Sequence, residues 1–310
     1  MTKYLISALI VYLFCCSLVA QTEPYVQSGY EKLGKRNFEG ANQDFSRLLQ
    51  SNPKSTDALV GRAEVRNSMG NYSDAMKDVE AALNLDGTII KAIIVKGDIL
   101  YNQKEYQNAL KMYEDVLQKQ NSSPQAIIGK SKTFNQLGKT KEAFKLLEDA
   151  IEQQPSNADF YYAKGLLNNI REKYSKALSD FDKAIALNPT TNLFGVYLNR
   201  GIAELAIEEI DKAIKDLSKA IEIDANNANA YHSRGMAYYQ SSLFKESIDD
   251  FLKSSELSPN NKITYYNLGM AYYKLEDRDN SCLYFHKSCQ LGNTNSCKMI
   301  IMNCPENSKR

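Results

Sequence analysis

The sequence predicts an all-α fold: a right-handed superhelical solenoid of about eight helical hairpins, closed by a C-terminal capping helix. Three observations predict it. Small and apolar residues recur every 34 residues over most of the chain. Within each period the apolar residues are spaced by three or four, which is typical of amphipathic helices. Only 7 prolines and 15 glycines occur among 310 residues, too few for the closely spaced turns of an all-β domain.

The first twenty residues differ in kind from the rest. "MTKYLISALIVYLFCCSLVAQ" has one early lysine, followed by a mainly apolar run from Leu5 to Ala20. That run is short for a membrane span and fits the core of a secretory signal peptide. We therefore expect residues 1–20 to be a signal peptide, and the protein to be exported to a periplasm, a secretory lumen or the medium. The alternative is an uncleaved signal that anchors the N-terminus in a membrane.

Two stretches, residues 22–53 and residues 158–189, align without a gap and define the repeat. Positions 4, 8, 17, 20, 24, 27 and 32 of the later stretch hold Tyr161, Gly165, Tyr174, Ala177, Phe181, Ala184 and Pro189. The same positions of the earlier stretch hold Tyr25, Gly29, Phe38, Ala41, Phe45, Leu48 and Pro53. The pattern starts at residues 22, 56, 90, 124, 158, 194, 228 and 262, so one step has 36 residues and the other six have 34.

Each period has the features of two helices that pack closely together. Position 8 is small, as in Gly97 and Gly235, and position 20 is small as well, as in Ala75 and Ala177. The Asn52-Pro53 pair ends the second helix, because proline lacks an amide proton and restricts the residue before it. One hairpin cannot bury both of its apolar faces, so neighbouring hairpins must stack.

The pattern resembles the tetratricopeptide repeat over residues 22–293. The tryptophan that the family usually has at position 4 is absent, and Tyr, Leu or Ile stands there. The resemblance implies an inner helix A and an outer helix B in each repeat. It also implies a concave groove lined by positions 2, 5, 9, 12 and 13 of helix A, and a role in binding proteins or peptides.

These positions supply the candidate site residues. They are Lys132, Asn135, Tyr162, Asn169, His232, Met236, Tyr239, Tyr266, Met270 and Tyr273. Tyrosine and methionine suit adaptable recognition, because they combine a large contact area with flexible packing. We therefore expect a non-catalytic, exported scaffold that binds a protein or peptide in this groove. The alternative is a carbohydrate or cell-wall-associated module whose tyrosines stack on sugars, and the same positions would also suit ordinary surface.

Other function classes find little support in the sequence. Only two histidines occur, His232 and His286, and no HExxH, GxSxG or phosphate-binding loop is present. We expect no catalytic residues, no cofactor and no metal. The net charge is +1 and no run of five basic residues occurs, which argues against a nucleic-acid partner. A membrane would be contacted only through an uncleaved signal anchor.

Four of the six cysteines lie in residues 281–304, "SCLYFHKSCQLGNTNSCKMIIMNC". We expect the last helix of repeat eight over about 280–291, a capping helix within 294–304, and a tail over 305–310. Residues that face each other across such an antiparallel pair have a constant sum of residue numbers. Cys289 with Cys297, and Cys282 with Cys304, share one sum. Cysteines seven residues apart share a helix face and lie roughly 10 Å apart along the axis.

Three states of these cysteines are conceivable: a zinc site, free thiols and two disulfides. A zinc site would usually contain a short Cys-x-x-Cys element, which is absent, and the two pairs lie too far apart for one ion. Free thiols fit a cytosolic protein, whereas the N-terminus indicates export and oxidising conditions. The segment "FHKSCQLGNTNSC" also resembles the Sel1-like repeats of cysteine-rich secreted proteins. We therefore expect the disulfides Cys289–Cys297 and Cys282–Cys304 to fasten the capping helix.

Peptide mapping of the exported protein without reductant tests this pairing. The expected result is two cross-linked peptides, one holding Cys289–Cys297 and the other Cys282–Cys304. Each bridge should contribute roughly 2–4 kcal/mol, because it restricts the unfolded chain. Four free thiols, stoichiometric zinc, or a bond between Cys282 and Cys289 would each contradict the prediction.

Overall fold

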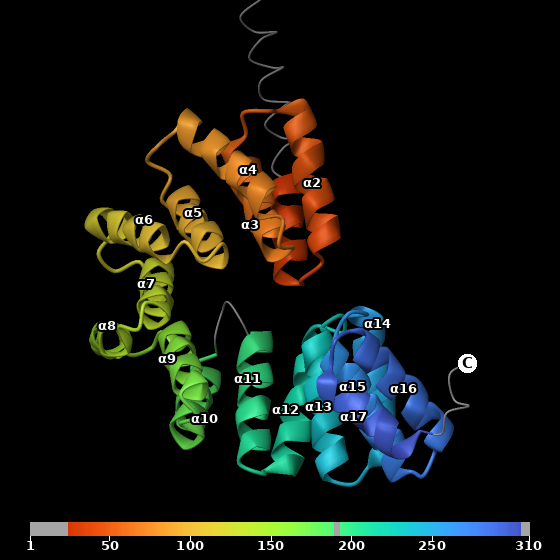
Figure 1. Cartoon of the computed structure of the whole chain (residues 1–310). Coiled ribbons are helices and arrows are strands. Elements are labelled where there is room, and N and C mark those ends of the chain that lie inside the picture. The colour runs from red at the N-terminus through yellow and green to blue at the C-terminus, as the bar shows by residue number, and fades with distance from the viewer. Residues whose placement is uncertain (1–23, 189–192, 305–310) are drawn as a thin grey trace, which may run out of the picture. The chain divides into compact units, whose positions relative to one another are not determined.

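The structure is a computed structural model that describes residues 24–188 and 193–304. Every regular element in these ranges is helical, and the helices follow one another along the chain as antiparallel hairpins (Figure 1). The predicted all-α repeat solenoid is thereby confirmed. The expected signal peptide and the tail over 305–310 lie outside the described residues.

The chain forms two compact units, one from Met1 to Pro155 and one from Ser156 to Arg310. A helical segment over residues 24–34 opens the described part of the first unit. It is followed by α2 (Phe38–Ser51), α3 (Thr56–Ser68), α4 (Tyr72–Leu85), α5 (Ile90–Asn102), α6 (Tyr106–Lys119), α7 (Pro124–Gln136) and α8 (Thr140–Gln153). The second unit holds α9 (Ala158–Ile170), α10 (Tyr174–Ala186), α11 (Leu193–Ala206), α12 (Ile210–Ile223), α13 (Ala228–Gln240), α14 (Phe244–Leu257), α15 (Lys262–Lys274), α16 (Arg278–Gln290) and α17 (Thr294–Asn303).

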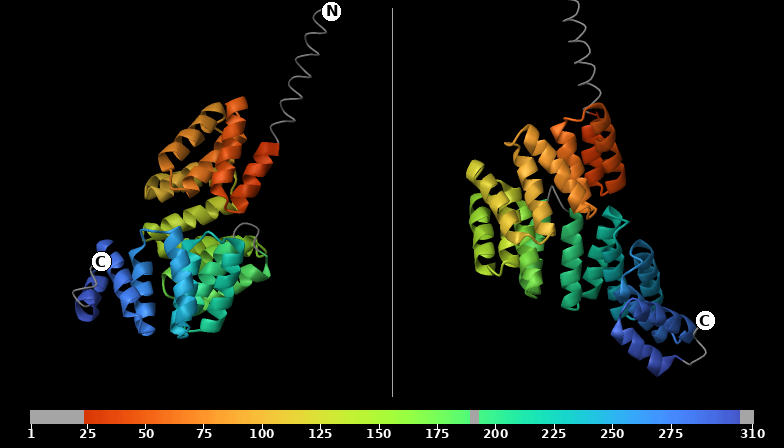
Figure 2. Two further views of the ribbon diagram at one scale, coloured as in Figure 1. Left: turned by 90° about the vertical axis from the view of Figure 1, so that its right-hand side faces the viewer. Right: turned by 45° about the horizontal axis from the view of Figure 1, so that its top comes forward.

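Each unit has two layers of helices. An A helix packs on the B helix of its own hairpin, and that B helix packs on the A helix of the next hairpin, as α13, α14 and α15 do. Neighbouring A helices also contact one another: α3 contacts α5, α5 contacts α7, and the series α9, α11, α13, α15 does the same. Figure 2 shows these hairpins from two further directions. The A helices of each unit therefore form a layer of their own.

In five of the described hairpins the core is built on an aromatic ring that packs against a glycine. Position 24 holds Phe45, Tyr113, Phe181, Phe251 and Phe285, all of which are at most 1% exposed. A Cβ atom on Gly235 would lie 2.8 Å from the ring of Phe251, and one on Gly269 would lie 2.5 Å from the ring of Phe285. The missing Cβ of position 8 is thus the space that the ring fills, which is why small residues recur there.

Ion pairs between helix A and helix B recur at a fixed separation that the sequence analysis did not identify. Arg62 donates two hydrogen bonds to Asp78, of 2.8 and 2.7 Å. Arg234 donates two bonds of 2.8 Å to Asp250. These partners are sixteen residues apart, at positions 7 and 23 of their repeats. Because each aspartate is at least nine-tenths buried, the guanidinium supplies the hydrogen bonds that its carboxylate needs.

Two helix boundaries differ from the sequence expectation. Helix α16 begins at Arg278 rather than near Asn280, because the side chain of Asp277 accepts a hydrogen bond from the backbone amide of Asn280 and caps the helix. Helix α11 begins at Leu193, one residue before the predicted start of the sixth repeat. Helix boundaries are set by local backbone geometry, and the repeat alignment does not resolve them to a single residue.

The ring-on-glycine contact predicts the effect of a single methyl group. Gly235→Ala should destabilise the protein by about 1–3 kcal/mol, because the new Cβ would overlap the ring of Phe251 and force the two helices apart. Urea denaturation followed by circular dichroism measures this.

Two further variants control that experiment. Gly34→Ala should be neutral or slightly stabilising, because no atom lies within 4 Å of the added methyl group. Combining Gly235→Ala with Phe251→Leu should cost less than the sum of the two changes, since the smaller side chain makes room for the methyl group. Strict additivity would contradict this interpretation.

Candidate functional site

The A-helix layer of the second unit contains a small pocket between α13 and α15. Its volume is about 130 Å³, and it is lined by Met236, Tyr239, Tyr266, Asn267 and Met270. Four of these five residues are among the predicted groove residues, and the repeat spacing brings them together from two successive A helices. Asn267 was missed, because it occupies position 6, which was not among the positions read as groove-lining.

The two tyrosine rings of the pocket rest on phenylalanines of the B helices. The ring of Tyr239 meets that of Phe244 edge to face at 5.4 Å, and the ring of Tyr266 is tilted on that of Phe285 at 6.0 Å. Burial raises the pKa of Tyr239, and the nearby Tyr266 raises it further. The phenol of Tyr239 is therefore neutral at physiological pH, and none of the five lining residues has an acidic or basic side chain.

A chain of hydrogen bonds orients the polar member of the pocket. The Asn267 side-chain amide donates to Met236 Sδ at 3.1 Å and faces His232 Nε2 at 3.4 Å. His232 Nδ1 lies 3.0 Å from Thr264 Oγ1. Since the amide is the donor to Nε2, the proton of a neutral imidazole sits on Nδ1. Burial lowers the pKa of His232, so this residue supports the pocket as a neutral ring.

The other predicted groove residues lie away from this pocket. Tyr273 is 45% exposed on α15 and does not line it. Tyr162, on α9, accepts a hydrogen bond of 3.3 Å from Asn199. Asn169, at the end of the same helix, has a buried side-chain oxygen without a hydrogen-bond partner among the described residues. The repeat pattern therefore places these residues on A helices without joining them into one pocket.

Lys132 and Asn135 belong to α7 of the first unit. Lys132 is exposed, and the side-chain oxygen of Asn135 accepts a bond of 3.2 Å from Thr140. Acidic residues of the same A-helix layer are engaged internally. Glu64 pairs with Lys91 at 3.1 Å, and Asp98 accepts a bond of 2.6 Å from Tyr113. Burial raises the pKa of both carboxyl groups.

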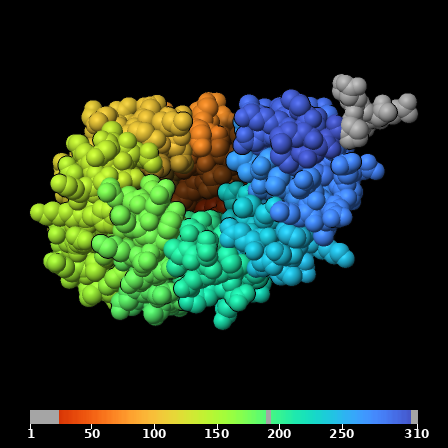
Figure 3. All heavy atoms as spheres, turned by 60° about the horizontal axis from the view of Figure 1, so that its bottom comes forward, coloured from red at the N-terminus to blue at the C-terminus, as the bar shows by residue number. Residues whose placement is uncertain are grey.

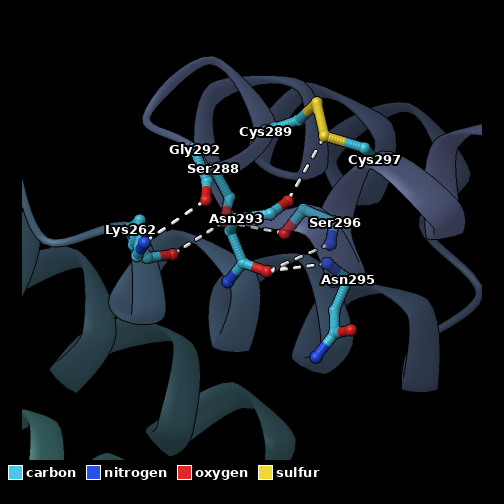
Figure 4. The surroundings of a disulfide bond; sticks show 8 residues. All are labelled: Lys262, Ser288, Cys289, Gly292, Asn293, Asn295, Ser296 and Cys297. Atoms are coloured by element: carbon cyan, nitrogen blue, oxygen red, sulfur yellow. Dashed lines mark hydrogen bonds between the residues drawn. A yellow bond between two sulfur atoms is a disulfide. The ribbon is translucent and has the colours of Figure 1, made fainter.

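The C-terminal end of the second unit is fastened by two disulfides. Cys282 is joined to Cys304 and Cys289 to Cys297, with Cα–Cα distances of 5.7 and 5.0 Å. Figure 4 shows the second bond together with a buried hydroxyl relay, in which Ser296 donates to Ser288 and Ser288 donates to the Lys262 carbonyl, each over 2.7 Å. Helix α17 is thus held to α16 by covalent bonds and, through Ser288, to α15.

Figure 3 shows the atoms of the second unit as successive bands from green to blue, with α17 as the last band.

In the part of the chain that the structure describes, no helix is long and apolar enough to cross a membrane. Within the same residues, no cluster of three or more histidine, cysteine or acidic side chains could hold a metal ion.

Comparison with known families identifies the repeat. Tetratricopeptide-repeat family models match residues 27–87, 201–242, 228–261 and 264–295. A model described as the TT21 fifth ARM repeats domain, another helical repeat, matches residues 91–192. No curated protein sequence matches the chain.

Solved structures share the fold at low sequence identity. The Cut9–Hcn1 hetero-tetramer of APC/C matches with a TM-score of 0.70 and 12% identity over 93% of this chain, which spans 55% of the matched chain. A tetratricopeptide repeat protein from Parabacteroides merdae has a TM-score of 0.53 and 17% identity, covering 81% of this chain and 98% of its own. YrrB, described as having an unusual peptide-binding site, has a TM-score of 0.52 and 19% identity, covering 60% of this chain and 96% of its own.

The buried imidazole behind the pocket predicts a specific pH dependence. The pKa of His232 is lower in the folded than in the unfolded chain, so the unfolded chain binds the proton first. The stability that neutral His232 contributes is therefore present above pH ~6.5 and is lost as the pH falls below that value. His232→Gln, measured by urea denaturation at pH 7.5 and pH 5.5, should lose less stability on acidification than the parent. Equal losses in the two proteins would contradict the prediction.

Proposed function

The chain is a tetratricopeptide repeat protein, and from this premise we propose that it is a non-catalytic scaffold that binds a protein or peptide segment on its A-helix layer. The binding site is the pocket between α13 and α15. The observation that carries this proposal is the lining of that pocket: two tyrosines, two methionines and one amide, none of them charged. Such a surface suits a peptide side chain better than an ionic substrate.

The size and lining of the pocket indicate what it holds. A volume of about 130 Å³ suits one medium-sized side chain rather than a whole small molecule. Methionines can adjust to the shape of an aliphatic guest, and the phenylalanines hold the tyrosine rings in place. We therefore propose that one aliphatic side chain or methionine of the partner enters between Tyr239 and Tyr266, with Asn267 fixing its position.

Export of the protein is part of the same proposal. The signal-like N-terminus supports it, and so does the disulfide-fastened end, because two disulfides persist in an oxidising compartment. The partner would then be an exported or surface protein. YrrB, a tetratricopeptide repeat protein with an unusual peptide-binding site, supports this mode of binding by analogy.

Replacing Tyr239, Tyr266 and Tyr273 together by alanine should abolish peptide capture. Tyr239 and Tyr266 line the pocket and should contribute ~1–2 kcal/mol each as anchors, whereas Tyr273 should contribute less because it lies outside. The measurement is selection from a displayed random-peptide library on the immobilised protein, followed by titration of the selected peptides. Circular dichroism checks that the variant is folded.

Matched controls make this test decisive. Ile263→Ala with Leu283→Ala removes two apolar side chains that are 54% and 53% exposed, on α15 and α16, outside the pocket. This double variant should bind normally. If the tyrosine variant unfolds, Met270→Lys puts a charge into the pocket instead and should also prevent binding. Binding to a glycan array without peptide selection would favour the carbohydrate alternative and overturn the proposal.

A further inference from the structure

A second and larger hollow of about 490 Å³ lies in the second unit, where α10, α11 and α12 meet. None of the predicted groove residues lines it. Its walls include the apolar parts of Leu178 and Tyr197, and its volume is in the range of small-ligand sites.

The floor of this cleft is formed by three buried or half-buried ionic groups. Arg200 donates two hydrogen bonds to Asp216, of 2.5 and 2.9 Å, and a third of 2.6 Å to Asp182 at the mouth. The third floor group is Glu204, which is only 6% exposed. Its Oε2 atom has no hydrogen-bond partner among the described residues.

Glu204 departs from a pairing that three other hairpins share. In those hairpins the residue twelve places before the aspartate at position 23 donates a hydrogen bond to it: Lys32 to Asp44, Arg66 to Asp78 and Asn168 to Asp180. In this hairpin the same place holds an acid, so two carboxyl groups face one another across a single guanidinium. That arrangement costs stability unless a further cation supplies the missing hydrogen bonds.

Burial and the neighbouring Asp216 raise the pKa of Glu204 to about 7. The other charged groups that face it are Arg200 on α11, Lys212 on α12 and Glu209 in the turn between them. Glu209 is itself paired with Lys212. A buried acid that titrates near neutrality inside a cleft is typical of a functional site rather than of a structural ion pair.

The mouth of the cleft has the opposite character. Lys215 and Lys219 are both exposed, and the ammonium group of Lys219 lies over the ring of Tyr197 at 5.3 Å. With Glu204 ionised, the floor carries one excess negative charge. The mouth, which includes these two lysines, the Lys212–Glu209 pair and Asp182, carries one excess positive charge.

We propose that this cleft binds a zwitterionic ligand, whose guanidinium or ammonium group pairs with Glu204 while its carboxylate contacts Lys215 and Lys219. A free guanidino or amino acid has this chemistry, and so does the C-terminal arginine or lysine of another protein. Tyr197 and Leu178 pack on the aliphatic part of the ligand.

Titration calorimetry of the full chain tests the proposal with four probes. 4-Guanidinobutyrate carries both charges, propylguanidinium only the positive one and butyrate only the negative one. Acetyl-Gly-Gly-Arg presents the same two groups on a peptide. We expect 4-guanidinobutyrate to bind at least tenfold more tightly than propylguanidinium or butyrate. If the peptide binds more tightly than 4-guanidinobutyrate, the natural ligand is the C-terminus of another protein. If 4-guanidinobutyrate binds more tightly, the natural ligand is a free metabolite.

Three variants assign the binding to the cleft. Glu204→Gln keeps the shape of the side chain and removes its charge, so it should weaken 4-guanidinobutyrate at least tenfold. The exposed neighbour Glu208→Gln should change nothing. Lys215→Gln with Lys219→Gln should weaken 4-guanidinobutyrate but leave propylguanidinium unchanged.

Affinity should also rise roughly tenfold between pH 6 and pH 8, as a group of pKa near 7 ionises. No heat with any probe at 10 mM would overturn the proposal. So would binding that Glu204→Gln leaves intact. Because Glu204→Gln relieves a buried like-charge contact, it should fold at least as well as the parent, and loss of binding could not be ascribed to unfolding.

Discussion

The contact on which the rest of the structure depends is the packing of an aromatic ring of helix B against a glycine of helix A, which occurs in five of the described hairpins. It sets the distance between the two helices, and that distance in turn fixes which side chains of neighbouring hairpins can meet. Phe45 shows how far the contact reaches: a Cβ on Gly29 of its own hairpin, or on Gly61 of the next, would lie within 2.6 or 2.4 Å of its ring. One ring therefore sets the distance both within its own hairpin and to the next hairpin. The 34-residue period of the sequence reflects this repeated packing.

With the spacing fixed, the two surfaces of a hairpin stack take different roles. The A-helix layer gathers one face from each repeat, and in the second unit this brings Tyr239 of α13 and Tyr266 of α15 into the lining of one pocket without charged side chains. The rings beneath them, Phe244 and Phe285, belong to B helices. The same packing that stabilises the hairpins thus orients the tyrosines, so little freedom is lost when a partner binds.

The recurring Arg–Asp pair shows how a departure from a repeated rule becomes informative. Arg62 and Arg234 satisfy buried aspartates of their own hairpins with paired hydrogen bonds. Arg200 does the same for Asp216, yet Glu204 adds a second acid that this single guanidinium does not satisfy. In a repeat protein the hairpins can be compared with one another, and residues that recur in them are those that the fold needs. A buried residue that differs in one hairpin, such as Glu204, is therefore a candidate for a functional role.

The sequence by itself determined the helical hairpins, their number and order, and the facing cysteine pairs, because helix periodicity and a fixed repeat length are local properties. It also placed four of the five pocket residues, since positions on helix A translate directly into a face. Only the tertiary structure revealed the roles of Asn267 and Glu204 and the ion pairs between residues sixteen apart. Their significance lies in the atoms they meet: Asn267 meets His232 across two repeats, and Glu204 faces Asp216 across two helices. Such contacts depend on the distance and tilt between helices, and a pattern of residue types along one chain does not contain them.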